Sequence, residues 1–303
     1  MIKHLQPPLP VKIWITGCNG MLGHEFADAC SRSNITWVGS DREIDITDRD
    51  SISHFASLHQ PQWIINCAAY TAVDKAESEH DLARLLNVEG PGNLAELANR
   101  LGIPLIHFST DYVFDGFRER PWCEDDATNP LSFYGLTKRD GEKRIFAATD
   151  RFFLFRISWL YGQFGSNFVR KILRLLREQD VLRVISDQRG APTWAQTLVE
   201  NIVSIIVRNE ARYGIYHYAD DGIISWHEFA TAIRDISLDL GLITNTVPIE
   251  AIPTEAYPLP AQRPRNSAFD KSRVRDMLNF KLHHWRKNLA TFLAQERDAS
   301  RKS

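Results

Sequence analysis

The sequence of 303 residues has no excess of either charge, no enrichment in glycine or proline and no long apolar run. With 16 glycines and 14 prolines, it lacks the composition of a collagenous or low-complexity chain. Its formal net charge of −2 provides no global attraction to nucleic acid or to an acidic membrane. Hydrophobic residues make up 44% of the chain, enough for a sizeable core. We therefore expect a globular protein with one large domain or two modest ones.

The four cysteines, Cys18, Cys30, Cys67 and Cys123, are scattered and form no CxxC pair. No His/Cys group has the spacing of a zinc site. No apolar stretch approaches the roughly 20 residues that span a bilayer, and the initial MIKHLQPPLP lacks the apolar core of a secretory signal. We expect a cytoplasmic protein with reduced cysteines and a loose tail over residues 1–10, without membrane or nucleic-acid partners.

Short apolar runs alternate with amphipathic segments through the first half of the chain. The strand candidates are VKIWITG, ITWVGS, QWIINCAA, IPLIHFST and FFLFRISW. Nearly continuous apolar runs are typical of strands buried on both faces of a parallel sheet. The segments between them, such as Asp81–Leu101, repeat apolar residues at helical spacing. The pattern predicts an α/β fold with a doubly wound parallel sheet and right-handed crossovers.

A glycine-rich turn, GCNGMLG, follows the first strand candidate and opens an amphipathic segment. GxxGxxG spacing allows a tight turn, close approach of the backbone to a pyrophosphate, and close helix–strand packing. The helix N-terminus adds free N–H groups and a positive dipole end. This context predicts a dinucleotide site, with a tight turn that binds nothing as the alternative. The residues expected to contact the dinucleotide are Gly17, Asn19, Gly20, Met21, Leu22 and Gly23.

Asp41 and Arg42 follow the second strand candidate and indicate different cofactors. A carboxylate here can bind the adenosine ribose 2′-hydroxyl and favours NADH, whereas an arginine can pair with a 2′-phosphate and favours NADPH. The preference stays open, and a solvated charged loop is the alternative. The small residues of Asn66–Ala69, after the third strand candidate, predict another wall of the same cleft.

Tyr134 and Lys138 stand four residues apart, so a helix would place both on one face. Reducing a ketone needs a hydride donor at one side and a proton donor at the oxygen. A free tyrosine, with a pKa of about 10, is a poor donor at neutral pH, and a nearby ammonium lowers that pKa. We predict that Tyr134 donates the proton and that Lys138 lowers its pKa and binds the nicotinamide ribose. A surface tyrosine beside a solvated lysine is the alternative.

The fourth strand candidate ends in Ser109, Thr110 and Asp111. A hydroxyl at this strand end can hydrogen-bond a substrate carbonyl and hold it against Tyr134. We select Thr110, with Ser109 as the second choice and a turn-capping hydroxyl as the alternative. Asp111 could bind a substrate hydroxyl or cap the backbone.

The pattern changes from about Tyr161. The expected elements are helices at Asn167–Glu178, Pro192–Asn209 and Ser225–Leu240 and a strand at Leu182–Asp187. The proline-rich AIPTEAYPLPAQRPRNS is too irregular for a regular element, and long ordered loops are often functional. We predict a dinucleotide-binding domain over residues 1–160 and a mostly substrate-binding lobe over 161–303, with the helix near 192–209 packing back on the first domain.

Together these motifs resemble the extended short-chain dehydrogenase/reductases, which have a Rossmann cofactor domain. Longer strings narrow the resemblance to the dTDP-4-dehydrorhamnose reductase family. They are NCAAYTAVDKAESE, STDYVFDG, NPLSFYGLTKRDGE, RISWLYG, DQRGAPT, YHYADDGIISWHEFA and AYPLPAQRPRNSAFD. The resemblance runs from about Val11 to about Ala294. The late strings matter most, because they lie outside the shared cofactor fold.

The resemblance implies an oxidoreductase that uses NADPH or NADH. It would reduce the 4-keto group of dTDP-4-dehydro-L-rhamnose and so form dTDP-L-rhamnose. A homodimer is a possible assembly. It assigns catalysis to Thr110, Tyr134 and Lys138. Further cofactor contacts are implied at Asp41, Arg42, Asp45, Ile46, Cys67, Ala68, Ala69, Tyr70, Tyr134 and Lys138. Substrate contacts are implied at Thr71, Val73, Asp74, Thr110, Asp111, Trp159 and Arg265. Trp159 could instead be an ordinary core tryptophan. Arg265 is a candidate partner of the diphosphate, and the alternative is a solvent-exposed arginine.

Some relatives bind Mg²⁺ at a dimer contact through glutamates. Glu25 stands at a suitable place on the first helix, but Gln196 stands where a second acid would be expected. We therefore assign no metal site and keep Glu25 as a candidate ligand.

Two other functions stay open. One is another nucleotide-sugar enzyme of the extended family, such as an epimerase or dehydratase, which regenerates its bound cofactor within each turnover. The other is a non-catalytic regulatory subunit like that of methionine adenosyltransferase. The presence of Tyr134, Lys138 and Thr110 argues against this second function.

Overall fold

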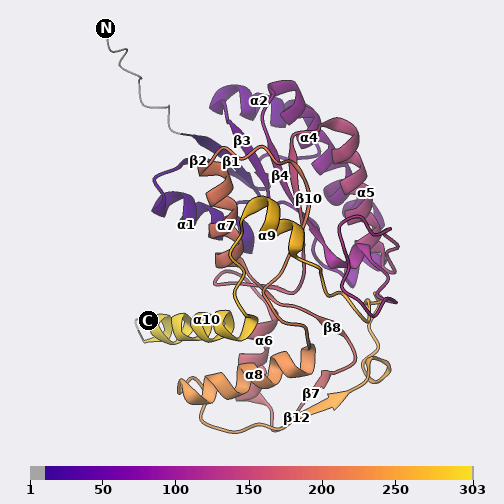
Figure 1. Ribbon diagram of the computed structural model, residues 1–303, viewed down its shortest axis with the longest axis vertical. Coiled ribbons are helices and arrows are strands. Elements are labelled where there is room, and N and C mark those ends of the chain that lie inside the picture. Colours follow the sequence, from indigo (N-terminus) through magenta and orange to yellow (C-terminus); the bar gives the residue numbers. More distant parts are fainter. Residues whose placement is uncertain (1–10, 302–303) are drawn as a thin grey trace.

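The computed structural model describes residues 11–301, and within them a six-stranded parallel sheet carries helices on both faces (Figure 1). The predicted loose tail, residues 1–10, lies outside the described residues. In spatial order the strands are β10 (Gly214–Tyr218), β5 (Phe152–Ile157), β4 (Leu105–Thr110), β3 (Trp63–Asn66), β1 (Lys12–Thr16) and β2 (Thr36–Ser40). The order reverses between β1 and β3, so their carboxyl ends form the crevice where such sheets bind ligands. The predicted doubly wound parallel sheet is confirmed.

Successive side chains of the strands pack into two separate cores. On β1, Ile13 and Ile15 face one core and Trp14 the other, which explains why the strand sequences are apolar throughout. Helices α1 (Met21–Arg32) and α7 (Ala195–Val207) cover the first face. Helices α2 (Arg49–His59), α4 (Gly90–Leu101) and α5 (Phe133–Ala148) cover the second.

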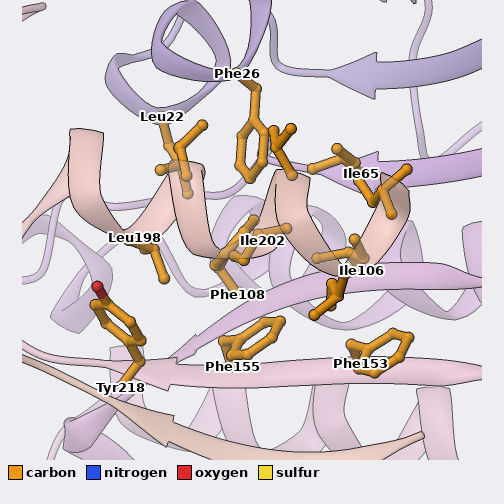
Figure 2. Packing of buried hydrophobic residues seen from close by; sticks show 14 of the residues in the cluster. Leu22, Phe26, Ile65, Ile106, Phe108, Phe153, Phe155, Leu198, Ile202 and Tyr218 are labelled. Atoms are coloured by element: carbon orange, nitrogen blue, oxygen red, sulfur yellow. The ribbon is translucent and has the colours of Figure 1, made fainter. Parts of the chain in front are cut away.

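The first core shows how distant parts of the chain share one layer. Phe26 of α1 and Ile202 of α7 pack over Phe108 and Phe155 of neighbouring strands (Figure 2). The rings of Phe26 and Phe108 are 5.7 Å apart. Burial of each such side chain contributes about 1.5–3 kcal/mol, so this layer anchors α1 and the turn before it.

The predicted helix over Asp81–Leu101 is interrupted. The structure has α3 (His80–Arg84), a widened π turn η2 (Leu85–Glu89) and then α4. The π turn holds Asn87, whose amide bonds the backbone N–H and carbonyl of Tyr70 (2.9 and 3.0 Å) and the Thr137 hydroxyl (3.1 Å). Single π turns in helices often mark functional sites, and this one ties the segment after β3 to α5.

The second half of the chain forms a lobe around a further core and also returns to the sheet. The lobe contains α6 (Phe168–Glu178), β7 (Leu182–Ile185), α8 (Trp226–Asp239), β12 (Ile249–Ile252) and α10 (Trp285–Ser300). Helix α8 starts with a capping box between Ser225 and Glu228. The elements that return are α7, which packs on α1, strand β10, and α9 (Ser272–Leu278), which packs on β10. Between residues 11 and 301, no helix combines the length and apolarity needed to cross a membrane.

Candidate active site

A cavity of about 570 Å³ lies at the carboxyl ends of β1, β3, β4 and β5. It brings together the predicted catalytic residues Thr110, Tyr134 and Lys138. Other predicted contacts in its wall are Gly20, Met21, Leu22, Cys67, Ala68, Ala69, Thr71, Val73, Asp111 and Trp159. Segments far apart in the sequence therefore converge at the switch point of the sheet.

The glycine turn forms a backbone cradle at one end of the cavity. Gly17 has a φ of +63°, and a Cβ there would lie 2.7 Å from the backbone nitrogen of Ala68. At Gly23 a Cβ would overlap the Gly17 carbonyl oxygen, so both positions require glycine. Helix α1 starts after Gly20 without a side-chain cap and without an acidic residue in its first turn. Free N–H groups and the positive helix end therefore fit a pyrophosphate.

The acidic end of β2 lies beside this turn. Burial first, and then the carboxylates of Asp41 and Glu43, raise the pKa of the Cys18 thiol, which places both carboxylates near the turn. Glu43, which the sequence reading missed, accepts a hydrogen bond from the Asp41 backbone N–H at 2.7 Å. The Arg42 side chain is exposed. The surroundings of the cradle are thus mainly negative on this side.

Several residues implied as cofactor contacts do not line the cavity, among them Asp45, Ile46 and Tyr70. The Asp45 carboxylate accepts from the Thr47 backbone and hydroxyl, both at 2.8 Å. Ile46 is buried in the second core and packs against Gly90. The Tyr70 hydroxyl donates to Glu79 at 2.7 Å. All three side chains therefore have partners outside the cavity.

Tyr134 and Lys138 lie on the first turns of α5, which starts after Ser132, whose hydroxyl accepts from the Gly135 N–H. The Ser109 hydroxyl donates to Glu142, one turn further along the same helix. Glu142 forms a fully buried ion pair with Arg156, at 2.7 and 3.0 Å. Because Ser109 is engaged in this pair, Thr110 is the strand-end hydroxyl better placed to meet a substrate.

The electrostatics of the catalytic pair differ from the sequence expectation. Burial raises the pKa of Tyr134 above its ordinary value; the Thr110 hydroxyl opposes this shift and Asp111 adds to it. The ammonium of Lys138 donates to the Phe108 carbonyl at 2.6 Å, and burial lowers its pKa to about 8 against the favourable charge of Glu142. In this arrangement Lys138 does not lower the pKa of Tyr134, because its ammonium is directed at a backbone carbonyl.

Asp111 and Trp159 lie in the cavity wall, as predicted for substrate contacts. The Asp111 carboxylate is buried, accepts from the Thr110 hydroxyl at 3.0 Å, and has its pKa raised to about 6 by burial. The Trp159 indole stacks on Trp226 with ring centroids 3.6 Å apart, and its backbone φ of +48° is uncommon for a non-glycine residue. Its ring also covers Gly190, where a Cβ would lie 2.8 Å from it.

Asp74 and Arg265, implied as substrate contacts, do not line this cavity and are engaged in ion pairs. Asp74 forms a bidentate ion pair with Arg263, both contacts 2.8 Å, and accepts from the Ala261 backbone N–H at 3.2 Å. Arg265 is exposed and pairs with Glu255 at 2.9 Å. Arg263, which the sequence reading missed, also contacts the Tyr112 side chain. The loop 253–265 therefore directs Arg263 inward and Arg265 outward.

A second cavity, of about 780 Å³, adjoins the first and shares Tyr112 and Trp226 with it. Its wall is mostly apolar along α6 and β7 and includes Arg263. Together the two cavities offer a smaller space around Tyr134 and Lys138 and a larger one along α6 and β7.

Glu25, the candidate metal ligand, is buried and accepts from the Gln163 backbone N–H at 3.1 Å. Burial raises its pKa, which opposes the charged form that binds a cation. Gln196 donates to Glu200 at 3.0 Å. Among residues 11–301 no group of three or more His, Cys, Asp or Glu side chains is arranged to hold a metal ion.

The family model for the RmlD substrate binding domain matches residues 11–298. A dTDP-4-dehydrorhamnose reductase of Aggregatibacter actinomycetemcomitans is 36% identical over 93% of this chain and 98% of its own length. The crystal structure of a dTDP-4-dehydrorhamnose reductase from Clostridium acetobutylicum has a TM-score of 0.89 and 36% identity, covering 95% of this chain and all of the other. The Bacillus anthracis enzyme, solved in complex with NADP, has a TM-score of 0.87 and 32% identity over 95% of this chain and 100% of that chain. This chain therefore belongs to the dTDP-4-dehydrorhamnose reductase family.

Proposed function

We propose that this protein is a dTDP-4-dehydrorhamnose reductase, an oxidoreductase that uses NADPH or NADH to reduce the 4-keto group of dTDP-4-dehydro-L-rhamnose and yields dTDP-L-rhamnose. The observation that carries the proposal is the single cavity that is lined both by Tyr134, Lys138 and Thr110 and by Gly20 of the glycine turn. The first domain provides the cofactor site and most of the lobe provides the substrate site.

Each residue has a defined part in this reaction. The Gly17–Gly23 turn and the α1 N-terminus bind the pyrophosphate of the cofactor, which when bound supplies the hydride. Thr110 turns its hydroxyl from Asp111 to the substrate carbonyl and orients it. Tyr134 protonates that oxygen, a step typically worth about 10²–10⁴-fold in rate. Lys138 binds the nicotinamide ribose, and its ammonium lowers the tyrosine pKa once it turns from the Phe108 carbonyl toward the phenol.

The paired cavities support a long, two-part substrate. The sugar lies in the catalytic cavity, where Trp159 and Asp111 contact it, and the nucleotide extends past Tyr112 and Trp226 into the second cavity. The apolar side chains of this cavity suit a planar base, and Lys171, Arg183 and Arg263 in its wall suit the negative charge of a nucleotide. We assign no Mg²⁺ to the reaction, since proton and hydride transfer here need only the side chains named.

The carboxylates of Asp41 and Glu43 beside the turn oppose a 2′-phosphate. We therefore propose that NADH is preferred over NADPH, with Arg42 as the residue that still admits NADPH.

The direct test is oxidation of NADH and NADPH by the purified protein with dTDP-4-dehydrorhamnose, followed by the loss of reduced-nicotinamide absorbance. Enzymes usually turn over at about 1–10³ s⁻¹. We expect one cofactor oxidised for each dTDP-rhamnose formed, and a lower KM for NADH. Sugar conversion without net cofactor oxidation would instead indicate an epimerase or dehydratase. Absence of any conversion would overturn the proposal.

A further inference from the structure

A chain of buried polar side chains runs beneath the cavity from β1 to α5. The Thr16 hydroxyl donates to Asn66 Oδ1 at 2.7 Å, and Asn66 Nδ2 lies 3.0 Å from His107 Nδ1. His107 Nε2 in turn lies 3.4 Å from Lys138 Nζ. All four side chains are at most 2% exposed, so water does not compete for these contacts. The chain therefore connects the strand before the glycine turn to the catalytic lysine.

The orientation of the Asn66 amide follows from its backbone partner. The Ala68 N–H, which can only donate, lies 3.1 Å from Asn66 Oδ1. The oxygen therefore faces Ala68 and Thr16, and the NH₂ group faces His107. Since an NH₂ group can only donate, His107 Nδ1 must carry the lone pair. The neutral ring then has its proton on Nε2, the nitrogen that faces Lys138.

This tautomer opposes a charge on Lys138. An ammonium has only donors, so an ammonium at this place meets the ring N–H donor to donor, whereas a neutral amine can accept from it. Burial lowers the pKa of Lys138 to about 8, and burial and then Lys138 hold the pKa of His107 well below its ordinary value. His107 therefore cannot take up the charge itself without losing its bond to Asn66.

Other charged groups around the pair do not cancel this effect. Glu142 lies one turn from Lys138 on α5 and favours the ammonium, but its carboxylate is shared with Arg156 and Ser109. Tyr134, on the same helix, is neutral because burial raises its pKa. The charge of Asp111 acts on Tyr134.

We propose that His107 is a positioning residue for the reductase reaction: its Nε2–H, held in place by Asn66, keeps Lys138 near the balance between ammonium and amine. Resting on the proposed function, this gives Lys138 a second task. When Tyr134 passes its O–H proton to the substrate oxygen, its phenolate takes a proton from the Lys138 ammonium. The resulting amine accepts from His107, and the lysine regains its proton from water that enters the cavity, which Lys138 lines, once the product has left. A strongly basic lysine would hold its proton too tightly for this return step.

Asn66→Asp tests the proposal by inverting the tautomer. The new carboxylate still accepts from Ala68 and Thr16, but it also accepts from His107, whose proton moves to Nδ1. The Nε2 lone pair then accepts from the Lys138 ammonium and makes the lysine more basic. We expect the alkaline limb of the pH profile of kcat/KM to move up by about one pH unit. His107→Gln, whose amide oxygen can also accept, should move it in the same direction.

A matched control is His217→Gln. His217 is an equally buried histidine, which bonds the Trp122 carbonyl and lies 3.4 Å from Arg156. This variant should lose thermal stability like His107→Gln but leave the alkaline limb in place. A limb that moves as far in the control would overturn the proposal, since it would show a general effect of losing a buried imidazole.

Two NMR measurements on the full chain need no turnover: the tautomer of His107 from its ring ¹⁵N shifts, and the titration of Lys138 Nζ. We expect an Nε2-protonated ring in the wild type, an Nδ1-protonated ring in Asn66→Asp, and a higher lysine pKa in the variant. An Nδ1-protonated wild-type ring, or coincident lysine titrations, would refute the inference. If the wild type fails to reduce the sugar nucleotide, the proposed function falls, and the lysine titration alone decides whether His107 controls Lys138.

Discussion

The catalytic side of the cavity and its substrate side are held by different forces. Thr110, Tyr134 and Lys138 lie on β4 and α5, where backbone hydrogen bonds and apolar burial hold them. The substrate side depends on the loop 253–265, which an ion pair between Arg263 and Asp74 fastens to the segment after β3. Their side chains are 16% and 38% exposed, so solvent weakens the pair. The chemistry thus rests on regular structure, whereas part of the substrate wall is a loop held by this ion pair and by hydrogen bonds such as those of Thr254 to Asp187.

This difference separates the expected effects of mutation. Changes on the catalytic side should abolish turnover or cofactor binding, because no other group can replace a positioned proton donor or a backbone cradle. Changes to the ion pair should loosen the substrate wall while leaving the cofactor site intact.

The largest effect is expected for Tyr134→Phe, which removes the proton donor while keeping the ring. We expect kcat to fall by about 10²–10⁴-fold, with NADH affinity within a few-fold of the wild type. Steady-state kinetics and fluorescence titration of NADH measure both. A variant that keeps most of its rate would show that another group protonates the substrate.

Gly17→Ala should mainly affect the cofactor. Its Cβ would press on the Ala68 backbone at a φ of +63°, so the turn must open and lose its fit to the pyrophosphate. We expect the Kd for NADH to rise about tenfold or more. Gly241→Ala is the matched control, with a φ of +69° and nothing within 4 Å of the new Cβ. It should cost about 1 kcal/mol of stability but no NADH affinity; equal affinity losses in both would contradict the cradle.

Arg263→Gln and Asp74→Asn should each raise the KM for the nucleotide sugar about tenfold, with little change in the KM for NADH. The double variant should be no worse than either single one, because both remove the same contact. Glu255→Gln, which breaks the exposed Arg265 pair in the same loop, is the control and should change neither constant. A parallel rise in the KM for NADH would mean that the loop is not a separate unit.

The smallest effect is expected at Asp220, which does not line the catalytic cavity. It is 1% exposed, and burial raises its pKa from 3.8 to about 7, with Asn288 acting in the opposite direction. The pKa of Asp220 is higher in the folded than in the unfolded protein, so the protonated carboxyl favours folding. This contribution to stability is complete below about pH 4 and is lost as the pH rises through about 7. Asp220→Asn should therefore raise the melting temperature by a few degrees at pH 8 and little at pH 4. Equal shifts at both pH values would exclude ionisation as the cause.

Local patterns predicted the parts of the fold that depend on local physics. The apolar runs were sufficient to predict the parallel sheet, because a strand buried on both faces shows no alternation of apolar and polar residues. The glycine turn was sufficient for the cradle, because Gly17 needs a positive φ wherever the chain goes next. The helix over Asp81–Leu101 was wrong in detail: Asn87 bonds Tyr70 and Thr137, and helical spacing carries no sign of such distant partners.

The sequence by itself determined which chemistry this protein carries: a glycine cradle, a tyrosine and lysine one helical turn apart, and a strand-end hydroxyl. Only the tertiary structure decided how those groups are tuned. Partners from other strands and loops decide whether Arg263 or Arg265 turns inward. They also decide where the Lys138 ammonium points and which nitrogen of His107 bears a proton. Spacing along the chain encodes the first set, whereas strand order and loop docking create the contacts of the second.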